Sequence, residues 1–220
     1  MPRFMRQGCI EVVAMAILGG ILVCFPSARA DVPTDSSNET RATLDGFRSA
    51  RFGMNVQEVE NAILKDFSIE TSAIQREKHP TQKTENLWVS VKDLLPESGL
   101  AKLYYIFGFQ SKQLIQINVI WGSSDSEANN SAEVVAVANQ LREHFLRKGF
   151  QKEGLVMNAS LGEGILLVFR GTDARGRMVV LLLTDPEPQE KSKEKAPTLR
   201  LSYIVNPDNP DIYRIKDDAF

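Results

Sequence analysis

Residues 102–122, KLYYIFGFQSKQLIQINVIWG, carry the alternation that decides the fold class. Large apolar side chains occupy every second position in two runs: Leu103, Tyr105, Phe107 and Phe109 in the first, and Ile115, Ile117, Val119 and Trp121 in the second. A period of two places these side chains on one face of a β-strand. The intervening Gln110-Ser111-Lys112 fits a three-residue hairpin loop, so the stretch predicts two antiparallel strands with one buried face.

Two amphipathic helices flank this hairpin in the sequence. Asn55 and Glu58 are spaced as a capping box, which predicts that a helix begins at Asn55. A second helix is expected over residues 131–148, with Gly149 as its stop. Its apolar stripe consists of Val134, Val137, Ala138, Leu141 and Phe145. Because each helix has one apolar stripe, each should cover one surface.

Further strands are expected on both sides of the hairpin. They are residues 87–91, a weaker strand at 69–76, and then 165–170, 178–184 and 199–205. The run 178–183 is apolar at consecutive positions, which favours a central strand covered on both faces. Residues 158–162 have half of the nucleophile-elbow pattern, but we interpret them as a turn because the first glycine is missing.

The order of helix, strands, helix, strands predicts an α+β protein built from two helix-on-antiparallel-sheet halves. Each half is expected to be a helix followed by a β-hairpin and a further strand. Both helices open with Asn-x-x-Glu-Val, at Asn55 and at Asn130, which suggests a pseudo-repeat. The predicted segments are a signal peptide (1–30), a flexible leader (31–43), the first half (44–122), the second half (123–206, with an exposed polar loop at 186–197) and a C-terminal tail (207–220).

The sequence FGMNVQEV, residues 52–59, resembles the opening of small helix-on-sheet envelope modules. That group includes outer-membrane-assembly lipoproteins and secreted β-lactamase-inhibitor proteins. The resemblance implies helices laid on an antiparallel sheet and a non-catalytic binding role.

The first thirty residues have the layout of a secretory signal peptide. Arg3 and Arg6 precede an apolar run over residues 12–25, and Ala28-Arg29-Ala30 follows as a cleavage site. A bilayer-spanning helix needs about 20 apolar residues, so this run favours cleavage after Ala30 over a retained anchor. Val23 before Cys24 argues against a lipobox.

Both cysteines, Cys9 and Cys24, fall inside that segment, so the mature chain should be free of cysteine. This excludes a disulfide, a thiolate nucleophile and a cysteine zinc site. An exported chain that stabilises itself without disulfides fits a bacterial periplasm.

The charge and the histidine content of the chain exclude further classes of function. The net charge is −2 and lysine and arginine are not clustered, which argues against nucleic acid as a partner. His79 and His144 are the only histidines, and we interpret both as surface residues rather than metal ligands. No cofactor or metal site is therefore predicted. A pair of carboxylates could still act in glycoside hydrolysis, because the required separation in space cannot be read from a sequence.

Aromatic residues supply the candidate site. If the alternation of residues 87–91 turns Leu87 toward the helix, then Trp88 faces away, and the next strand puts Tyr104 and Ile106 on the same far face. Such a face either is covered by the other half or is an exposed surface for binding. Arg48 and Arg51 either rim that surface or are simply solvated.

We therefore expect an exported periplasmic binding module without catalytic activity. Its candidate binding residues are Trp88, Tyr104, Ile106, Arg48 and Arg51, and its partner is an envelope protein or another envelope macromolecule. The alternative is a small periplasmic hydrolase that uses paired carboxylates.

Overall fold

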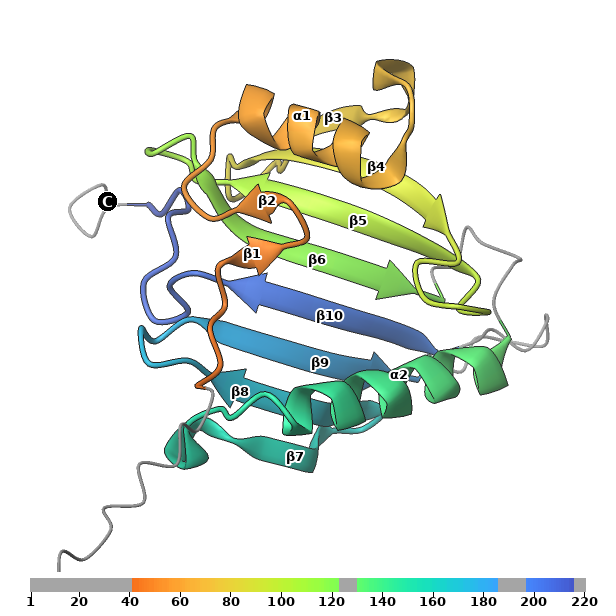
Figure 1. Cartoon of the computed structure of the whole chain (residues 1–220). Coiled ribbons are helices and arrows are strands. Elements are labelled where there is room, and N and C mark those ends of the chain that lie inside the picture. The colour runs from red at the N-terminus through yellow and green to blue at the C-terminus, as the bar shows by residue number, and fades with distance from the viewer. Residues whose placement is uncertain (1–40, 123–129, 186–196, 216–220) are drawn as a thin grey trace, which may run out of the picture. The chain divides into compact units, whose positions relative to one another are not determined.

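The computed structural model describes residues 41–122, 130–185 and 197–215. It confirms an α+β protein with two helices and a large antiparallel sheet (Figure 1). The predicted signal peptide, most of the leader and all but Pro197 of the polar loop lie outside the described residues.

One eight-stranded sheet dominates the fold, with the strand order β3-β4-β5-β6-β10-β9-β8-β7. A separate two-stranded hairpin, β1-β2, precedes it in the chain. In chain order the elements are β1 (Gly46–Phe47), β2 (Ala50–Arg51), α1 (Val56–Phe67), the 3-10 turn η1 (Thr71–Ala73), β3 (Gln75–Lys78), β4 (Glu85–Lys92), β5 (Leu100–Phe107), β6 (Leu114–Trp121), α2 (Ser131–Leu146), η2 (Lys152–Gly154), β7 (Val156–Gly162), β8 (Ile165–Thr172), β9 (Met178–Thr184) and β10 (Thr198–Ile204).

The two predicted halves lie side by side in this sheet. Their seam is the antiparallel pair β6-β10, in which Val119 lies opposite Leu201. Helix α1 packs over β4, and α2 packs over β8, β9 and β10, on the same face of the sheet (Figure 1). The second half therefore extends the sheet of the first half instead of stacking on it.

Both helices begin where the sequence predicts. Asn55 Oδ1 accepts the N–H of Glu58 at 3.0 Å, and the N–H of Asn55 donates to Glu58 Oε2 at 2.8 Å. Asn130 and Glu133 form the same capping box at the start of α2. Gly149, with φ of 71°, lies in the left-handed region just after α2, as expected of a helix stop.

The turn between β5 and β6 is longer than predicted and covers residues 108–113. The register shifts after Ile106, so that Phe107 pairs with Leu114 and Leu114 takes the buried position expected for Ile115. The C-terminal segment explains this turn, because the Asp211 carboxylate accepts the N–H groups of Gln110 and Ser111 at 2.9 and 2.8 Å.

Three other local predictions are wrong. Residues 158–162, expected to be a turn, belong to edge strand β7, and residues 69–76 form η1 and only the start of β3. In β9, Val179 and Leu181 are buried, but Met178, Val180 and Leu182 are only half-buried, because the sheet carries its helices on one face.

The end of the predicted flexible leader is part of the fold. Ala42 is buried, and its N–H donates to the carbonyl of Gly149 at 3.1 Å. The N–H of Leu44 donates to Asp173 Oδ2 at 3.0 Å. These bonds attach residues 42–44 to the second half, which composition could not reveal.

Candidate functional site

The face of the sheet that points away from both helices carries the aromatic residues singled out above. Trp88 lies directly opposite Tyr104 on the neighbouring strand, with ring centroids 6.1 Å apart and an interplanar angle of 30°. Leu87 and Val89, the neighbours of Trp88 in the chain, are buried in the core on the helix side. Trp88, Tyr104 and Ile106 thus share the predicted face, and all three are half-buried.

We call this surface the open face and define it by the register of the strands. Its residues include Gln75, Glu77, Asn86, Trp88, Ser90, Lys102, Tyr104, Ile106, Gln116, Asn118, Ile120, Met178, Val180, Leu182, Leu167, Arg170, Arg200, Ser202 and Ile204. Asn86, Leu167 and Ser202 are buried within it. One row runs straight across the sheet from Trp88 through Tyr104, Asn118, Ser202 and Val180 to Arg170. Since β10 pairs with β6, the second half continues this face and does not cover it.

The open face combines apolar and cationic groups. Lys102 Nζ lies 5.8 Å from the centre of the Trp88 ring, and Arg200 is exposed in the middle of the sheet. Strands β5, β6, β8, β9 and β10 contain no aspartate or glutamate. These five strands therefore contribute cations and no carboxylate to the open face.

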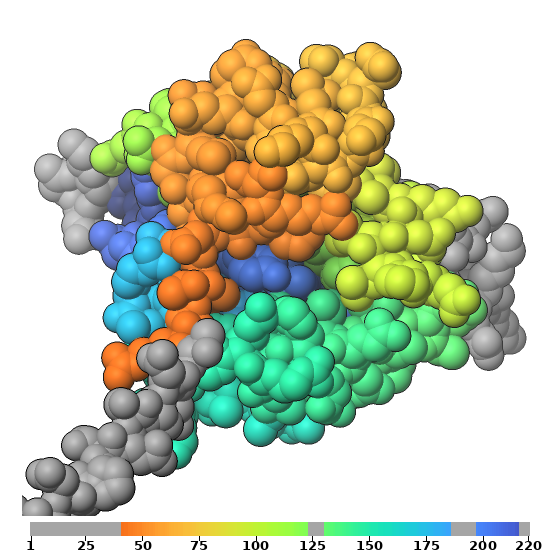
Figure 2. Space-filling model, in the orientation of Figure 1, coloured from red at the N-terminus to blue at the C-terminus, as the bar shows by residue number. Residues whose placement is uncertain are grey.

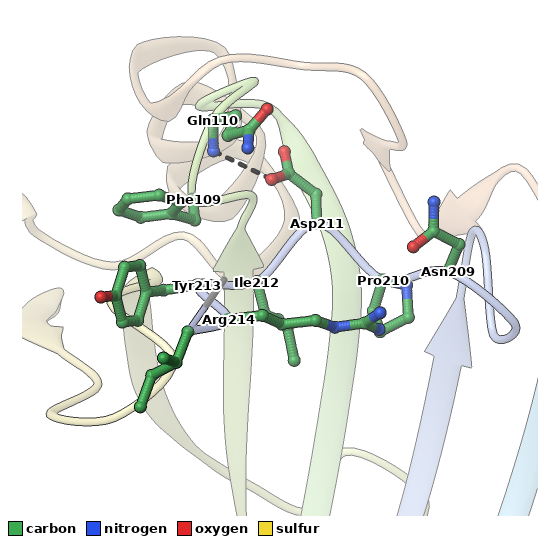
Figure 3. A pocket seen from close by; sticks show the side chains of 9 residues that line it. Phe109, Gln110, Asn209, Pro210, Asp211, Ile212, Tyr213 and Arg214 are labelled. Atoms are coloured by element: carbon green, nitrogen blue, oxygen red, sulfur yellow. Dashed lines mark hydrogen bonds between the residues drawn. The ribbon is translucent and has the colours of Figure 1, made fainter. Parts of the chain in front are cut away.

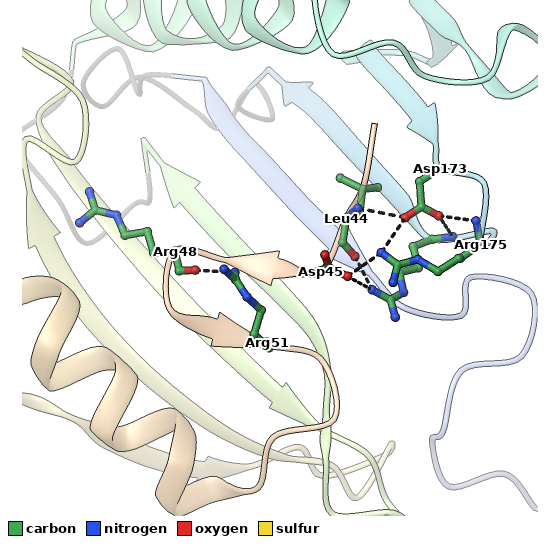
Figure 4. A network of polar contacts seen from close by, with 7 residues as sticks. Leu44, Asp45, Arg48, Arg51, Asp173 and Arg175 are labelled. Atoms are coloured by element: carbon green, nitrogen blue, oxygen red, sulfur yellow. Dashed lines mark hydrogen bonds and ion pairs between the residues drawn. The ribbon is translucent and has the colours of Figure 1, made fainter. Parts of the chain in front are cut away.

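Arg48 and Arg51 do not belong to this face, so the prediction that they rim it is wrong. They lie in the β1-β2 hairpin, on the helix side of the sheet (Figure 4). The Arg48 guanidinium lies 4.8 Å from the centre of the Phe67 ring and donates to the carbonyl of Asp66 at 3.1 Å. The hairpin folds back over the helix side, a placement that proximity to α1 in the sequence does not specify.

A network of carboxylates and arginines fixes the chain just before that hairpin (Figure 4). The buried Asp173 carboxylate accepts the N–H groups of Leu44, Arg175 and Arg177 at 2.9 to 3.0 Å. Asp45 accepts from the Arg175 and Arg177 side chains. The hydrogen bond from Arg175 is the main cause of the lowered pKa of Asp45, and burial of the carboxyl opposes it only in part. Both carboxylates thus serve to hold the fold.

Two clefts on the described part of the chain were considered as sites. The larger, of about 580 Å³, lies beside the C-terminal segment and is lined by Phe109, Gln110 and residues 209–215 (Figure 3). Asp211 is the one carboxylate in its lining, and both of its oxygens accept backbone N–H groups. Burial raises the pKa of Asp211, but the hydrogen bonds from Ser111 and Gln110 outweigh it, and the pKa is lowered overall.

The smaller cleft, of about 260 Å³, opens on the helix side between α2, the β1-β2 hairpin and the β4-β5 loop. Trp121, Leu201 and Tyr203 of β6 and β10 contribute to its lining, and the seam strand β10 is visible at the bottom of this hollow (Figure 2). No carboxylate lines it. A hydrolase site would need two converging carboxylates, and neither cleft provides them.

The comparisons with known proteins find no match: no protein-family model, no curated protein and no solved structure.

The described ranges are residues 41–122, 130–185 and 197–215. No group of three or more His, Cys, Asp or Glu residues in those ranges could hold a metal ion. Within the same ranges, no helix has both the length and the apolar character needed to cross a membrane.

The sequence predicted that Trp88, Tyr104 and Ile106 share one face of the sheet. It did not predict that residues of the second half lie on the same face. Arg200 and Ser202 share it with Trp88 only because β10 pairs with β6, and the sequence does not specify which strands become neighbours. Alternation within residues 199–205 could have put these two residues on one face of a strand. No sequence pattern could have predicted the helix-side cleft, since five separate segments of the chain form it.

Proposed function

We propose that this protein is an exported periplasmic module that binds another envelope protein through the open face and catalyses no reaction. The observation that carries the proposal is the continuous open face, with the stacked pair Trp88 and Tyr104 on it. Tryptophan and tyrosine are favoured anchors in protein interfaces, and exposed apolar patches on soluble proteins mark interaction sites.

The size of the face supports a protein partner. With strands about 4.8 Å apart and about 3.3 Å per residue, a sheet of these strands offers a flat area on the order of 800 Å². A standard protein interface buries about 800 Å² on each partner. One face of this sheet is thus large enough for a specific complex.

The charges on the face favour a partner of different sequence. In a symmetric dimer through this surface, Arg170 and Arg200 of one copy would face the cations of the other, and like charges at an interface are unfavourable. A partner with carboxylates around an apolar patch would complement the face instead.

The order of elements supports the idea of an internal repeat. Helix α1 is followed by η1 and strands β3 to β6, and α2 is followed by η2 and strands β7 to β10. We interpret these as two copies of one unit that associate through their last strands. This arrangement fits the helix-on-sheet modules that FGMNVQEV resembles, and export rests on the signal-peptide pattern of residues 1–30.

The test is crosslinking and affinity capture from the bacterial envelope, with the full chain as bait. Arg200→Glu reverses a charge on the open face, and Lys65→Glu makes the same change on the exposed side of α1. The proposal expects capture of one defined protein to be lost with Arg200→Glu and retained with Lys65→Glu. Equal capture by both variants would contradict it, as would a chain that is never exported.

A further inference from the structure

The helix-side cleft is a second candidate site, independent of the open face. The apolar lining comes from four parts of the fold. They are α2 (Leu141 and Phe145), the β4-β5 loop (Leu94 and Leu95), the seam strands (Trp121 and Leu201) and the β1-β2 hairpin (Phe47). A cavity of about 150 Å³ is sufficient for benzene, so a cleft of about 260 Å³ can accept a longer apolar group.

The polar groups of the lining are basic or neutral. They belong to Arg48 from the β1-β2 hairpin and to Gln140 and His144 from α2, while Tyr203 and Trp121 add aromatic side chains to the lining. Burial, Lys148 and Arg147 lower the pKa of His144, which favours the neutral imidazole, and a neutral imidazole can donate one hydrogen bond. Asp66 lies beside Arg48 but outside the lining, and its Oδ2 already accepts the N–H of Ser49 at 2.8 Å.

The charge of the lining indicates which polar ligand the cleft could hold. Arg48 supplies the only full positive charge among the residues that line the cleft, and no carboxylate is among them. The hairpin places Arg48 there, because Arg48 is the first residue of the two-residue β1-β2 turn, which also accounts for its φ of 51°. The indole N–H of Trp121 is buried and has no hydrogen-bond acceptor among the described residues, which ordinarily costs about 1–3 kcal/mol.

We propose that this cleft binds a small amphiphilic carboxylate, with its apolar chain among Leu94, Leu141 and Leu201 and its carboxylate beside Arg48 and His144. An apolar pocket with a few polar groups that fix orientation is the usual form of a small-molecule site. The guanidinium can give a charge-assisted hydrogen bond to a carboxylate but not to an uncharged alcohol of equal length. Octanoate and octanol are therefore suitable probes.

The two tryptophans of the chain make the test specific. Trp121 lines the cleft, whereas Trp88 lies on the opposite face of the sheet, so the Trp88→Phe chain reports on the cleft alone through its fluorescence. We expect octanoate to change the Trp121 emission saturably and to bind more tightly than octanol. Arg48→Gln should weaken octanoate about tenfold and leave octanol unchanged.

Matched variants separate the site from general effects. Arg51→Gln changes the neighbouring arginine, which does not line the cleft, and should not alter octanoate binding. Leu94→Phe should fill the cleft and weaken both probes, whereas Leu146→Phe, at an exposed position of α2 outside the lining, should weaken neither. Circular dichroism checks that each variant folds. If Arg48→Gln does not fold, His144→Gln takes its place in the test.

Three results would overturn the proposal. They are the absence of any saturable Trp121 response to octanoate, equal affinities for octanoate in the parent and in Arg48→Gln, and undiminished binding to Leu94→Phe. An octanoate response from Trp88 in the Trp121→Phe chain, with none from Trp121, would place the ligand on the open face and equally contradict it.

Discussion

Truncation of the two tryptophans in parallel separates the core from the open face. Trp121 is 1 % exposed and lies in the central core cluster, so Trp121→Ala removes a large side chain from a packed interior. Such truncations cost about 3–5 kcal/mol. Trp88 is half-buried, and the Tyr104 ring and the Lys102 ammonium lie near its ring. An aromatic pair contributes about 0.5–1.5 kcal/mol and an exposed cation–π contact about 0.5–1 kcal/mol, so Trp88→Ala should cost about 1–2.5 kcal/mol.

The measurement is urea unfolding followed by far-ultraviolet circular dichroism, because both substitutions remove a fluorophore. Partner capture is measured on the same proteins, and there Trp88→Ala should weaken binding about thirtyfold or more, corresponding to about 2 kcal/mol for an interface anchor. If Trp88→Ala destabilises the fold as much as Trp121→Ala, Trp88 is a core residue. The open face would then be covered, and the proposed binding role would have to be withdrawn.

Other predictions follow from the polar anchors and the loops. Asp173→Ala should lower the free energy of unfolding, measured with urea, by about 3 kcal/mol or more, because three backbone N–H groups lose a buried acceptor. Asp45→Ala removes an exposed ion pair and should lower it by less than about 1 kcal/mol. The folded-state pKa of Asp211 is lowered, so its carboxylate stabilises the fold above its ordinary pKa and this contribution is lost as the pH falls through the lowered value. Asp211→Asn should therefore flatten the acid limb of a stability profile measured by thermal melting, and an unchanged acid limb would refute the assignment. Deletion of residues 187–195, which carry no apolar side chain other than proline, should change the unfolding free energy by less than about 1 kcal/mol, and loss of folding would show that they contribute to the core.

Local signals predicted the helix starts and most of the strands. The spacing of Asn55 and Glu58 specifies a helix start by itself, because both hydrogen bonds of the capping box lie within four residues. Strands with strict alternation, such as β5, were equally clear. Edge strand β7 was missed because Asn158 and Gly162 resemble turn residues and only pairing with β8 makes the segment extended.

The candidate site could be predicted only in part for the same reason. Trp88 and Tyr104 come from strands that follow each other in the chain, so alternation alone put them on one face. The prediction that Arg48 rims the open face was wrong because the position of Arg48 depends on long-range hydrogen bonds. One of them joins Leu44 and Asp173, which lie 129 residues apart in the chain. No local pattern encodes a contact of that range.

The position of β10 has a consequence for how the chain acquires its structure. The last strand of the sequence lies in the interior of the sheet, between β6 and β9, where it pairs with both. Until residues 198–204 are available, β6 and β9 are unpaired edges and the two halves have no seam. Chains are synthesised from the amino terminus, so the eight-stranded sheet can be completed only after residues 198–204 have emerged. Before that point β6 and β9 each present an unpaired strand edge, the feature that favours pairing with another chain.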